Sequence, residues 1–377
     1  MKLDEFKSYI TRYGKDEKAL LRENPSLENL YAFSNQREGV IEWYPFVPGS
    51  RVLLIGADNG ALADIWLRKN CRLDVYEADR FEAEKLLCRY EEKIELIRII
   101  YDKADINDSY DYIVSVGTLQ LLSDSNVRKL FGLLKDGGRF ITACNNRYGI
   151  KWWSGAVSGD CCFSREDLEK KFSFVQEKES LWYYPMQDYL LPVSIYSDEY
   201  LPSPGELAHV IPAYNDNEFS TMDLGKKYDE VCRDGKFAEF ANSLVNIVYK
   251  GKAPEDKRAI FVKYNRTRKD DYKTKTVIYQ YADGSRDVEK SALYEAGKAH
   301  IASLIRKYEI LSSEDRDIEY VKPELCNDGW SVRYAFIQGK TLADRIAENI
   351  ADGADIFDEV RNGLRYVTGN DSVHNID

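Results

Sequence analysis

The sequence predicts an α/β protein in which a doubly wound parallel sheet is followed by a smaller α+β domain. Short apolar runs alternate with helical stretches between residues 51 and 144, and a glycine-containing turn joins the first run to the first helix. Beyond residue 257, several strands instead surround one long helix. The 377 residues, 44% of them hydrophobic, are enough to bury the cores of two ordinary domains.

The first domain is expected to begin with a helix that covers the sheet. Apolar side chains recur at helical spacing through residues 1–30, which predicts an amphipathic cover helix. The main domain is predicted over residues 31–250. Its strands are expected at 51–55, 72–77, 94–101, 112–116 and 139–144, with helices at 61–69, 80–90 and 126–134 between them.

The alternation of strands and helices stops after the fifth strand. Residues 147–225 are rich in Trp, Tyr, Pro and Ser and are too long for a simple connection, so we expect an aromatic-rich insertion that forms a lid or binds substrate. Residues 244–249 would supply a closing strand. Residues 250–257 have the composition of a linker, so the domain boundary is placed there.

The second domain, residues 258–377, has a different pattern. Asp283 and Gly284 form a typical hairpin turn between two predicted strands. One long helix is expected from about residue 292 to residue 311, and another opens at Thr341. Strands are expected at 260–264, 274–281, 286–290, 318–321 and 331–336.

Charge and hydropathy exclude several classes of function. The formal net charge is −11 and the sequence pI is about 5.1, which argues against nucleic acid as the main partner. No run of eighteen apolar residues exists and the first fifteen residues are charged throughout, so neither a membrane span nor a secretory leader is predicted. We therefore expect a cytoplasmic protein whose substrate is a small molecule or a neutral glycan.

Cysteine and tyrosine usage suggest packing rather than a metal site. The seven cysteines include no C-x-x-C pair and no histidine at ligand spacing, so they are expected to be reduced thiols. Cys161 and Cys162 are adjacent, and no metal is predicted there. Several of the 27 tyrosines lie between residues 183 and 200, where they could stack on sugar rings. Filling of half-buried strand and interface positions is the favoured explanation.

The loop from Gly56 to Gly60 predicts a cofactor site. It follows a strand and opens a helix, a context in which glycines let backbone amides approach a ligand. Glu77 ends the next strand, where a carboxylate can accept hydrogen bonds from both ribose hydroxyls. Together these residues indicate a nucleotide-type cofactor, and NAD uses a similar arrangement.

Six further segments resemble one family over most of residues 30–250. The sequence is similar to bacterial methyltransferases of cell-surface polysaccharide loci, which belong to the class I S-adenosylmethionine (SAM)-dependent enzymes. The matching segments are 31–38 (YAFSNQRE), 41–46 (IEWYPF), 146–155 (NRYGIKWWSG), 184–189 (YPMQDY), 195–202 (IYSDEYLP) and 237–243 (FAEFANS).

The resemblance implies a Rossmann-like methyltransferase sheet, SAM as the cofactor, and methyl transfer to a hydroxyl or related group of a surface polysaccharide or its precursor. Asp102 and Asp105 follow the third strand and are candidates for the adenine amino group, although surface turn acids are the favoured explanation. The predicted cofactor-binding residues are Gly56, Ala57, Asp58, Gly60, Glu77, Asp105 and Gly117.

Four residues depart from the pattern of that family. Leu54 replaces an acid of the first strand, and Asp58 replaces a glycine of the loop, where its carboxylate would repel the carboxylate of the cofactor. Gln120 and Asn145 stand where relatives often have glutamates. The alternative prediction is therefore a non-catalytic scaffold that organises partner proteins of a glycan-assembly complex. An NAD-dependent sugar- or nucleotide-modifying enzyme is a third possibility.

Methyl transfer to oxygen also needs a base or a positioned hydroxyl. The chain holds only three histidines. The candidates for this catalytic role are His209, Asp188 and Asp198, which lie in the aromatic-rich segment.

The C-terminal region resembles the N-terminal lobe of aminoglycoside-phosphotransferase-like or protein-kinase-like folds. The resemblance rests on the order of its elements and on residues 336–342 (FIQGKTL). It implies Lys290 as a phosphate-binding lysine and Glu295 as its helix partner. Solvated charges are the favoured explanation of that pair. Residues 373–377 (VHNID) resemble the start of a kinase catalytic loop and end at the aspartate, so we expect no phosphotransfer, in either a truncated chain or one that has lost this machinery.

Overall fold

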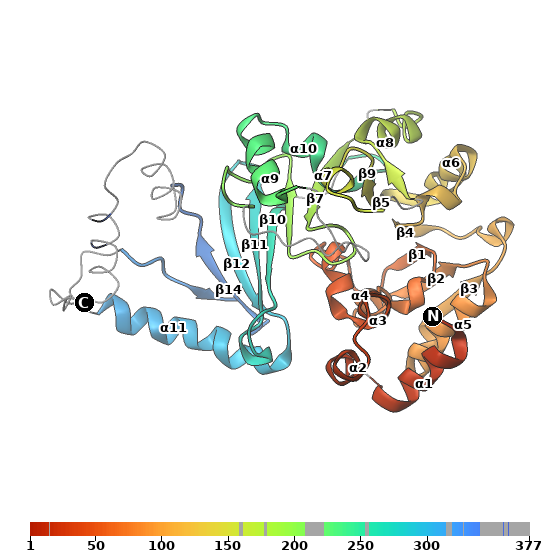
Figure 1. Ribbon diagram of the computed structural model, residues 1–377, viewed down its shortest axis with the longest axis horizontal. Coiled ribbons are helices and arrows are strands. Elements are labelled where there is room, and N and C mark those ends of the chain that lie inside the picture. The colour runs from red at the N-terminus through yellow and green to blue at the C-terminus, as the bar shows by residue number, and fades with distance from the viewer. Residues whose placement is uncertain are drawn as a thin grey trace. The chain divides into compact units, whose positions relative to one another are not determined.

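The computed structural model divides the chain into two units, Met1–Asp256 and Lys257–Asp377 (Figure 1). The structure describes residues 1–14, 16–157, 161–176, 179–207, 222–252, 256–313, 319–326, 328–339, 357 and 361.

A mixed sheet forms the centre of the first unit. The first five strands in the spatial order are parallel, β9 is antiparallel to both β5 and β7, and β8 is antiparallel to β7. A short strand, β6 (Cys162–Phe163), also pairs with the end of β5. The order is β3 (Ile97–Ile100), β2 (Arg72–Tyr76), β1 (Arg51–Ile55), β4 (Tyr110–Val116), β5 (Leu134–Asn146), β9 (Ser243–Tyr249), β7 (Ser180–Met186) and β8 (Ser194–Ser197).

The central strands are apolar on both faces because both faces of the sheet are covered. In β1, every residue from Val52 to Ile55 is buried, and Val52 lies opposite both Leu73 of β2 and Tyr112 of β4. These continuous apolar runs account for the success of the strand predictions at 51–55, 72–77, 112–116 and 139–144. The predicted strand at 94–101 is shorter, since a turn of 3-10 helix, η3 (Glu91–Leu96), takes its first part.

The single cover helix predicted over residues 1–30 is wrong in its continuity. Gly14 has a φ of +55° after the first helix, and the side chains of Asp16 and Ser26 cap two new helices. Phe6, Leu20, Ala32 and Phe33 still pack together across the breaks. The segment forms α1 (Leu3–Tyr13), α2 (Glu17–Glu23) and α3 (Leu27–Phe33).

The remaining helices of the unit connect strands or flank the sheet. The helix predicted at 61–69 is reduced to α4, while the helices predicted at 80–90 and 126–134 are confirmed as α5 and α6. These elements are η1 (Asn35–Val40), η2 (Asp58–Gly60), α4 (Asp64–Leu67), α5 (Arg80–Arg89), η4 (Lys103–Asp105), η5 (Leu119–Leu121), α6 (Asp124–Gly132), α7 (Ile150–Trp153), α8 (Arg165–Lys171), α9 (Leu224–Arg233) and α10 (Phe237–Phe240).

The aromatic-rich segment 147–225 contributes strands to the sheet in its described part, and its role as a lid or in substrate binding stays a prediction. Its strand β7 lies between β9 and β8, and Trp182, Tyr183 and Tyr184 are buried on it. The ring of Tyr183 packs 4.5 Å from that of Trp43. These aromatic side chains fill the sheet core, which was the favoured explanation of the tyrosine cluster.

The second unit contains an antiparallel sheet in the order β13, β14, β12, β11 and β10. The turn at Asp283 and Gly284 joins β11 to β12 as predicted, and Gly284 has a φ of +84°. Ile301 of α11 packs on Ala292 and Val332 of the sheet. The elements are β10 (Lys257–Asn265), η6 (Asp270–Tyr272), β11 (Thr274–Tyr281), β12 (Arg286–Ala292), η7 (Glu295–Gly297), α11 (Lys298–Ser312), β13 (Glu324–Leu325) and β14 (Ser331–Ala335).

Two predictions for this unit need correction or lie outside the description. The strand expected at 318–321 is absent from residues 319–321, and the chain pairs instead at Glu324–Leu325, opposite β14. The helix expected at Thr341 and the motif at 373–377 lie outside the described residues. Within the described ranges, no helix combines the length and the apolar character needed to cross a membrane.

A buried carboxyl group, Glu38 of η1, lies beside the sheet. Its side chain contacts Arg68, with 2.5 Å between Oε2 and Nη2, and the residue is only 6% exposed. Burial raises the pKa of Glu38 to about 7, although Arg68 opposes the shift. Because the folded state binds this proton more tightly than the unfolded chain does, the associated stability is present at low pH and is lost as the pH rises towards 7.

We predict that Glu38→Gln changes stability in a pH-dependent way. The shift from 4.5 to about 7 corresponds to about 3 kcal/mol, so the variant should gain about that much relative to the natural chain between about pH 4 and pH 8. Urea unfolding of both proteins across this range measures the difference. A stability difference that is independent of pH would contradict the prediction.

Candidate functional site

The carboxyl ends of the parallel strands define the place where a ligand can bind. The chain runs outward from β1 to β2 and β3 on one side, and from β4 to β5 on the other, so the order of the strands reverses between β1 and β4. Loops that leave neighbouring strands in opposite directions open a crevice at such a point. The loops after β1, β2, β4 and β5 carry the residues described below.

The glycine loop after β1 is shaped by a close approach of the backbone to Thr118. Gly56 has a φ of +91°, and a Cβ atom there would lie 2.7 Å from Cγ2 of Thr118. Thr118 itself donates a hydrogen bond of 2.6 Å to the carbonyl of Ile55. Asp58 and Asn59 also have positive φ values, of 44° and 52°. The loop therefore requires glycine at position 56 and holds two larger residues in a left-handed conformation.

Glu77, at the end of β2, lies against this loop as the sequence predicts. Its Oε2 accepts a hydrogen bond of 2.9 Å from the amide of Ala57, and its Oε1 accepts one of 2.9 Å from the amide of Asp79. Each carboxylate oxygen can accept more than one hydrogen bond. Glu77 thus orders the loop and retains acceptor capacity for hydroxyl groups of a ligand.

The charge of Asp58 is paired with a residue that the sequence analysis did not select. Arg37 of η1 forms an ion pair with Asp58, and its Nη1 donates to the carbonyl of Leu190 over 3.3 Å. Arg37 is 2% exposed. The carboxylate at position 58 is therefore not the uncompensated negative charge that the sequence suggested.

Gly117 and Tyr189 meet at the end of β4. Gly117 has a φ of +69°, and a Cβ atom there would lie 2.8 Å from Oη of Tyr189. Tyr189 is buried, which raises the pKa of its hydroxyl above its usual range. Its backbone amide donates to Oγ of Ser243 over 3.0 Å. Tyr189 thus holds the segment after β7 against the turn after β4.

A buried lysine lies beside the end of β5. Nζ of Lys151, on α7, is 2.5 Å from Oδ1 of Asn145 and 3.4 Å from Oδ2 of Asp188. Lys151 and Asp188 are 4% and 6% exposed. Burial lowers the pKa of Lys151, against the opposing charge of Asp188. Oδ1 of Asp188 also accepts from the amides of Leu190 and Leu191, so this predicted residue lies among the carboxyl-edge loops.

The other predicted site residues occupy different surroundings. Asp198 follows β8 and pairs with Arg165 over 3.0 Å, while Tyr184 donates a hydrogen bond to it. Asp102 accepts a hydrogen bond of 2.8 Å from the amide of Ala104, and both Asp102 and Asp105 are exposed. His209 lies outside the described residues.

Two of the four departures from the family pattern lie in contrasting surroundings. Leu54 is 1% exposed within β1, where its apolar side chain fits the core. Gln120 is exposed after β4, and its amide donates to the carbonyl of Gly117 over 3.2 Å. The polar group at position 120 is thus at the edge of the site, whereas position 54 supplies no polar group to it.

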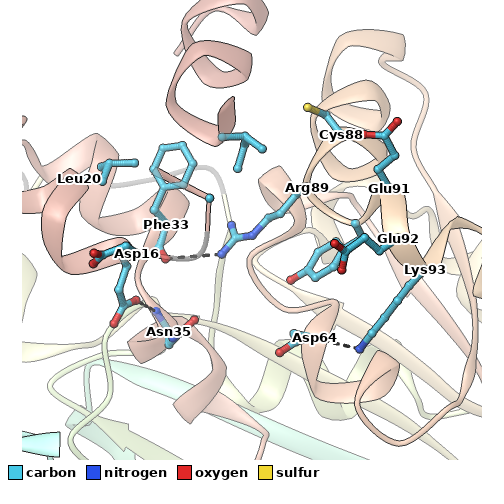
Figure 2. A pocket seen from close by; sticks show the side chains of 14 residues that line it. Asp16, Leu20, Phe33, Asn35, Asp64, Cys88, Arg89, Glu91, Glu92 and Lys93 are labelled. Carbon is cyan, nitrogen blue, oxygen red and sulfur yellow. Dashed lines mark hydrogen bonds and ion pairs between the residues drawn. The ribbon is translucent and has the colours of Figure 1, made fainter. Parts of the chain in front are cut away.

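A separate pocket of about 500 Å³ lies among the N-terminal helices and the end of α5 (Figure 2). Arg89 projects into it and donates hydrogen bonds to the carbonyls of Ala32 and Phe33, at the end of α3. The lining includes both acids and bases, with Asp64 paired to Lys93 over 3.8 Å. The pocket shares no lining residue with the carboxyl-edge site.

The pair of Lys290 and Glu295 that the kinase-like resemblance implied is not formed in the second unit. Glu295 is a largely exposed side chain that pairs with Lys298 over 2.9 Å. Lys290 is partly buried on β12, and burial together with the positive charges of Arg268 and Lys307 lowers its pKa. Glu295 is three residues before Lys298 at the start of α11, so Lys298 supplies the counter-charge of the Glu295 carboxylate.

The described residues include no cluster of three or more His, Cys, Asp or Glu side chains that could hold a metal ion. All seven cysteines lie within the described ranges, and none of them forms a disulfide there. Cys144 is fully buried, and burial raises its pKa well above the usual range. The thiols therefore act as small apolar side chains in the described fold.

Comparison with known proteins gives similarity at the level of structure only. No family model and no curated protein matches the sequence. Among solved structures, the N-methyltransferase NodS from Bradyrhizobium japonicum WM9 in complex with S-adenosyl-L-homocysteine is 15% identical, with 66% of this chain and 98% of that chain covered and a TM-score of 0.34.

Two other methyltransferases give comparable values. Geranyl diphosphate C-methyltransferase from Streptomyces coelicolor A3(2) is 14% identical, with 63% and 82% coverage and a TM-score of 0.36. A TehB-like SAM-dependent methyltransferase from Corynebacterium glutamicum is 11% identical, with 66% and 99% coverage and a TM-score of 0.36. Similarity this low does not determine the cofactor or the acceptor of this chain.

Three residues of the site were missed from the sequence, namely Arg37, Lys151 and Tyr189. Each lies inside a segment that resembles the methyltransferase family, so the segments were the available signal. The contacts were not predictable, because Arg37 reaches Leu190 across 153 residues and Lys151 reaches Asp188 across 37.

We predict that Asp188→Ala destabilises the protein by about 3–5 kcal/mol, because it leaves the ammonium of Lys151 buried without its partner. The double variant Lys151→Met/Asp188→Ala should recover part of that loss, since both charges are then removed. The exposed pair of Lys170 and Glu166 supplies the control, for which Glu166→Gln should cost less than about 1 kcal/mol. Urea unfolding monitored by circular dichroism measures the stability of all three variants. Equal losses of unfolding free energy from Asp188→Ala and Glu166→Gln would contradict the prediction.

Proposed function

We propose that the first unit binds SAM at the carboxyl edge of its sheet and transfers the methyl group to an oxygen or related atom of a surface polysaccharide or its precursor. The strand order is the observation that carries the proposal. The order in which the chain adds its five parallel strands to the sheet reverses between β1 and β4. Strand β9 lies between β5 and β7 and is antiparallel to both. The reversal places the glycine loop and Glu77 at the carboxyl ends of the parallel strands, and the sequence resemblance favours SAM as the ligand there.

The residues of the edge fit an adenosine cofactor. The glycine at position 56 leaves the loop backbone accessible, while Glu77 retains acceptor capacity for ribose hydroxyls. Asp102 and Asp105 are exposed after β3, where an acceptor for the adenine amino group is needed. Gly117 bounds the site after β4. When bound, SAM supplies a sulfonium methyl group that is already a reactive electrophile.

Lys151 is the residue we assign to the acceptor side of the site. Burial lowers the pKa of its ammonium group, so the group loses its proton more readily than a surface lysine does, and the neutral amine can then take the proton of an acceptor hydroxyl. In this proposal Asp188 and Asn145 orient the amine, and Asp188 is a positioning residue rather than the base. Proximity and orientation of the acceptor supply most of the rate.

The acceptor class rests on the sequence resemblance and on charge. A protein with a net charge of −11 repels polyanions, which favours a neutral glycan over a nucleic acid or a strongly acidic polymer. The buried tyrosines of β7 serve the sheet core, so they are not assigned to sugar binding.

Calorimetry with SAM and S-adenosylhomocysteine tests the cofactor. We expect saturable binding to the full chain, weakened about tenfold by Glu77→Gln, because the variant loses a charged acceptor for the ribose hydroxyls. Glu84→Gln, on the half-exposed outer part of α5, is the matched control and should bind as the natural chain does. The absence of binding by the natural chain at millimolar cofactor would eliminate the proposed function.

A second candidate is a methyltransferase-shaped scaffold for a glycan-assembly complex. Leu54 provides no polar group to the site, and Asp58 forms an ion pair with Arg37. Both features disfavour a cofactor such as SAM, whose amino-acid part carries an ammonium and a carboxylate. Under this alternative the natural chain does not bind SAM, and Leu54→Glu/Asp58→Gly creates binding. Measurable SAM affinity of the natural chain would count against the scaffold.

A further inference from the structure

The guanidinium of Arg37, beside the glycine loop, has one N–H donor without a hydrogen-bond partner. Nη1 donates to the carbonyl of Leu190, and Nη2 donates to Asp58. Nε has no hydrogen-bond partner among the described residues, although the atom is buried. A buried donor without an acceptor is costly. Nε of Arg37 therefore needs a hydrogen-bond acceptor that the surrounding protein does not provide.

The geometry of guanidinium groups specifies what that group is. Nε and Nη2 form one edge of the planar fork, and a carboxylate that approaches this edge accepts two parallel hydrogen bonds. Asp58 is bonded only to Nη2, through one of its oxygens. The loop carboxylate therefore occupies half of a position that a ligand carboxylate could fill completely.

Asp58 contacts Arg37 while its own backbone is in an unfavourable conformation. Its φ of 44° and that of 52° at Asn59 lie in the left-handed region, which non-glycine residues adopt at some cost. The segment from Gly56 to Gly60 contains glycine only at its two ends. The ion pair with Arg37 compensates for this conformation, so loss of the pair would free the loop to change.

A ligand carboxylate cannot simply be added to this arrangement. One cation would then face two carboxylates in a poorly hydrated site, and like charges that share such a site disfavour one another. Asp58 must leave Arg37, or the ligand must lack a carboxylate at this end. The other charged pair nearby, Lys151 with Asp188, is already neutral as a pair and does not offset the excess charge.

We propose that Asp58 is an internal competitor for the carboxylate of the cofactor, with Arg37 as the cation for which the two compete. The inference rests on the proposed function and deepens it. Asp58 weakens the binding of adenosyl ligands that carry an amino-acid carboxylate, SAM included, without abolishing it, and it leaves the binding of adenine nucleosides that lack one unchanged. S-adenosylhomocysteine and 5′-methylthioadenosine differ by this end of the molecule and are the probes.

Calorimetry on the full chain with both probes tests the inference. We expect the natural chain to bind 5′-methylthioadenosine at least as tightly as S-adenosylhomocysteine. Asp58→Asn keeps the size and left-handed tolerance of the residue but removes its charge, so it should tighten S-adenosylhomocysteine about tenfold or more and leave 5′-methylthioadenosine within about twofold. Asp58→Gly, which suits the positive φ, should give the same selectivity and serves as a second variant in case Asp58→Asn folds poorly.

Two further variants identify the cation and control for net charge. Arg37→Gln/Asp58→Asn should lose the gain for S-adenosylhomocysteine while it still binds 5′-methylthioadenosine. Asp124→Asn removes one negative charge from an 83% exposed side chain and should change neither affinity.

The outcomes separate this inference from the proposed function. Equal tightening of both probes by Asp58→Asn, or no change in either, overturns the competition between carboxylates while the nucleoside site stands. A natural chain that prefers S-adenosylhomocysteine strongly, with a preference that the variants do not alter, also overturns it. Failure of S-adenosylhomocysteine to bind the natural chain at millimolar concentration eliminates the proposed function. The competition between carboxylates is also overturned if the Asp58 variants then fail to bind S-adenosylhomocysteine.

Discussion

The reversal of strand order between β1 and β4 is the constraint on which the first unit depends. A parallel sheet brings the carboxyl ends of its strands to one edge, and the reversal sends adjacent connections to opposite faces. The backbone must therefore turn sharply directly after β1 and β4, where Gly56 and Gly117 have positive φ values and adjoin Thr118 and Tyr189. The position of these turns determines where every polar group of the site can lie.

Buried charge is the second organising feature of that edge. Arg37 with Asp58 and Lys151 with Asp188 each place a cation and a carboxylate out of contact with most of the solvent. Burial of two charges is costly even when they are paired, so such pairs are weak evidence for stability alone. One pair lies beside the glycine loop and the other at the end of β5, and the backbone of Leu190 contacts both Arg37 and Asp188.

The two resemblances in the sequence differed in what they could predict. Apolar strand patterns and the glycine loop located the first sheet, because burial on both faces produces continuous apolar runs. For residues 147–225 the sequence predicted no strand positions, and the structure places the aromatic strands β7 and β8 in the sheet. In the second unit, hairpin and helix patterns were predictable. The pairing of Lys290 with Glu295 that the kinase-like resemblance implied is not formed, since Lys298 is the partner of Glu295.

By itself, the sequence determined the alternation of strands and helices, the glycine loop, and the acid after β2, because each depends on local periodicity or on a backbone conformation that one residue type adopts. The tertiary structure alone decided which charges face one another. The glycine loop suggested a nucleotide-type site from Gly56, Gly60 and Glu77, and Asp58 suggested repulsion within it. The fold pairs Asp58 with Arg37 instead, since the buried guanidinium of Arg37 requires a counter-charge, and the two residues are 21 positions apart in the sequence.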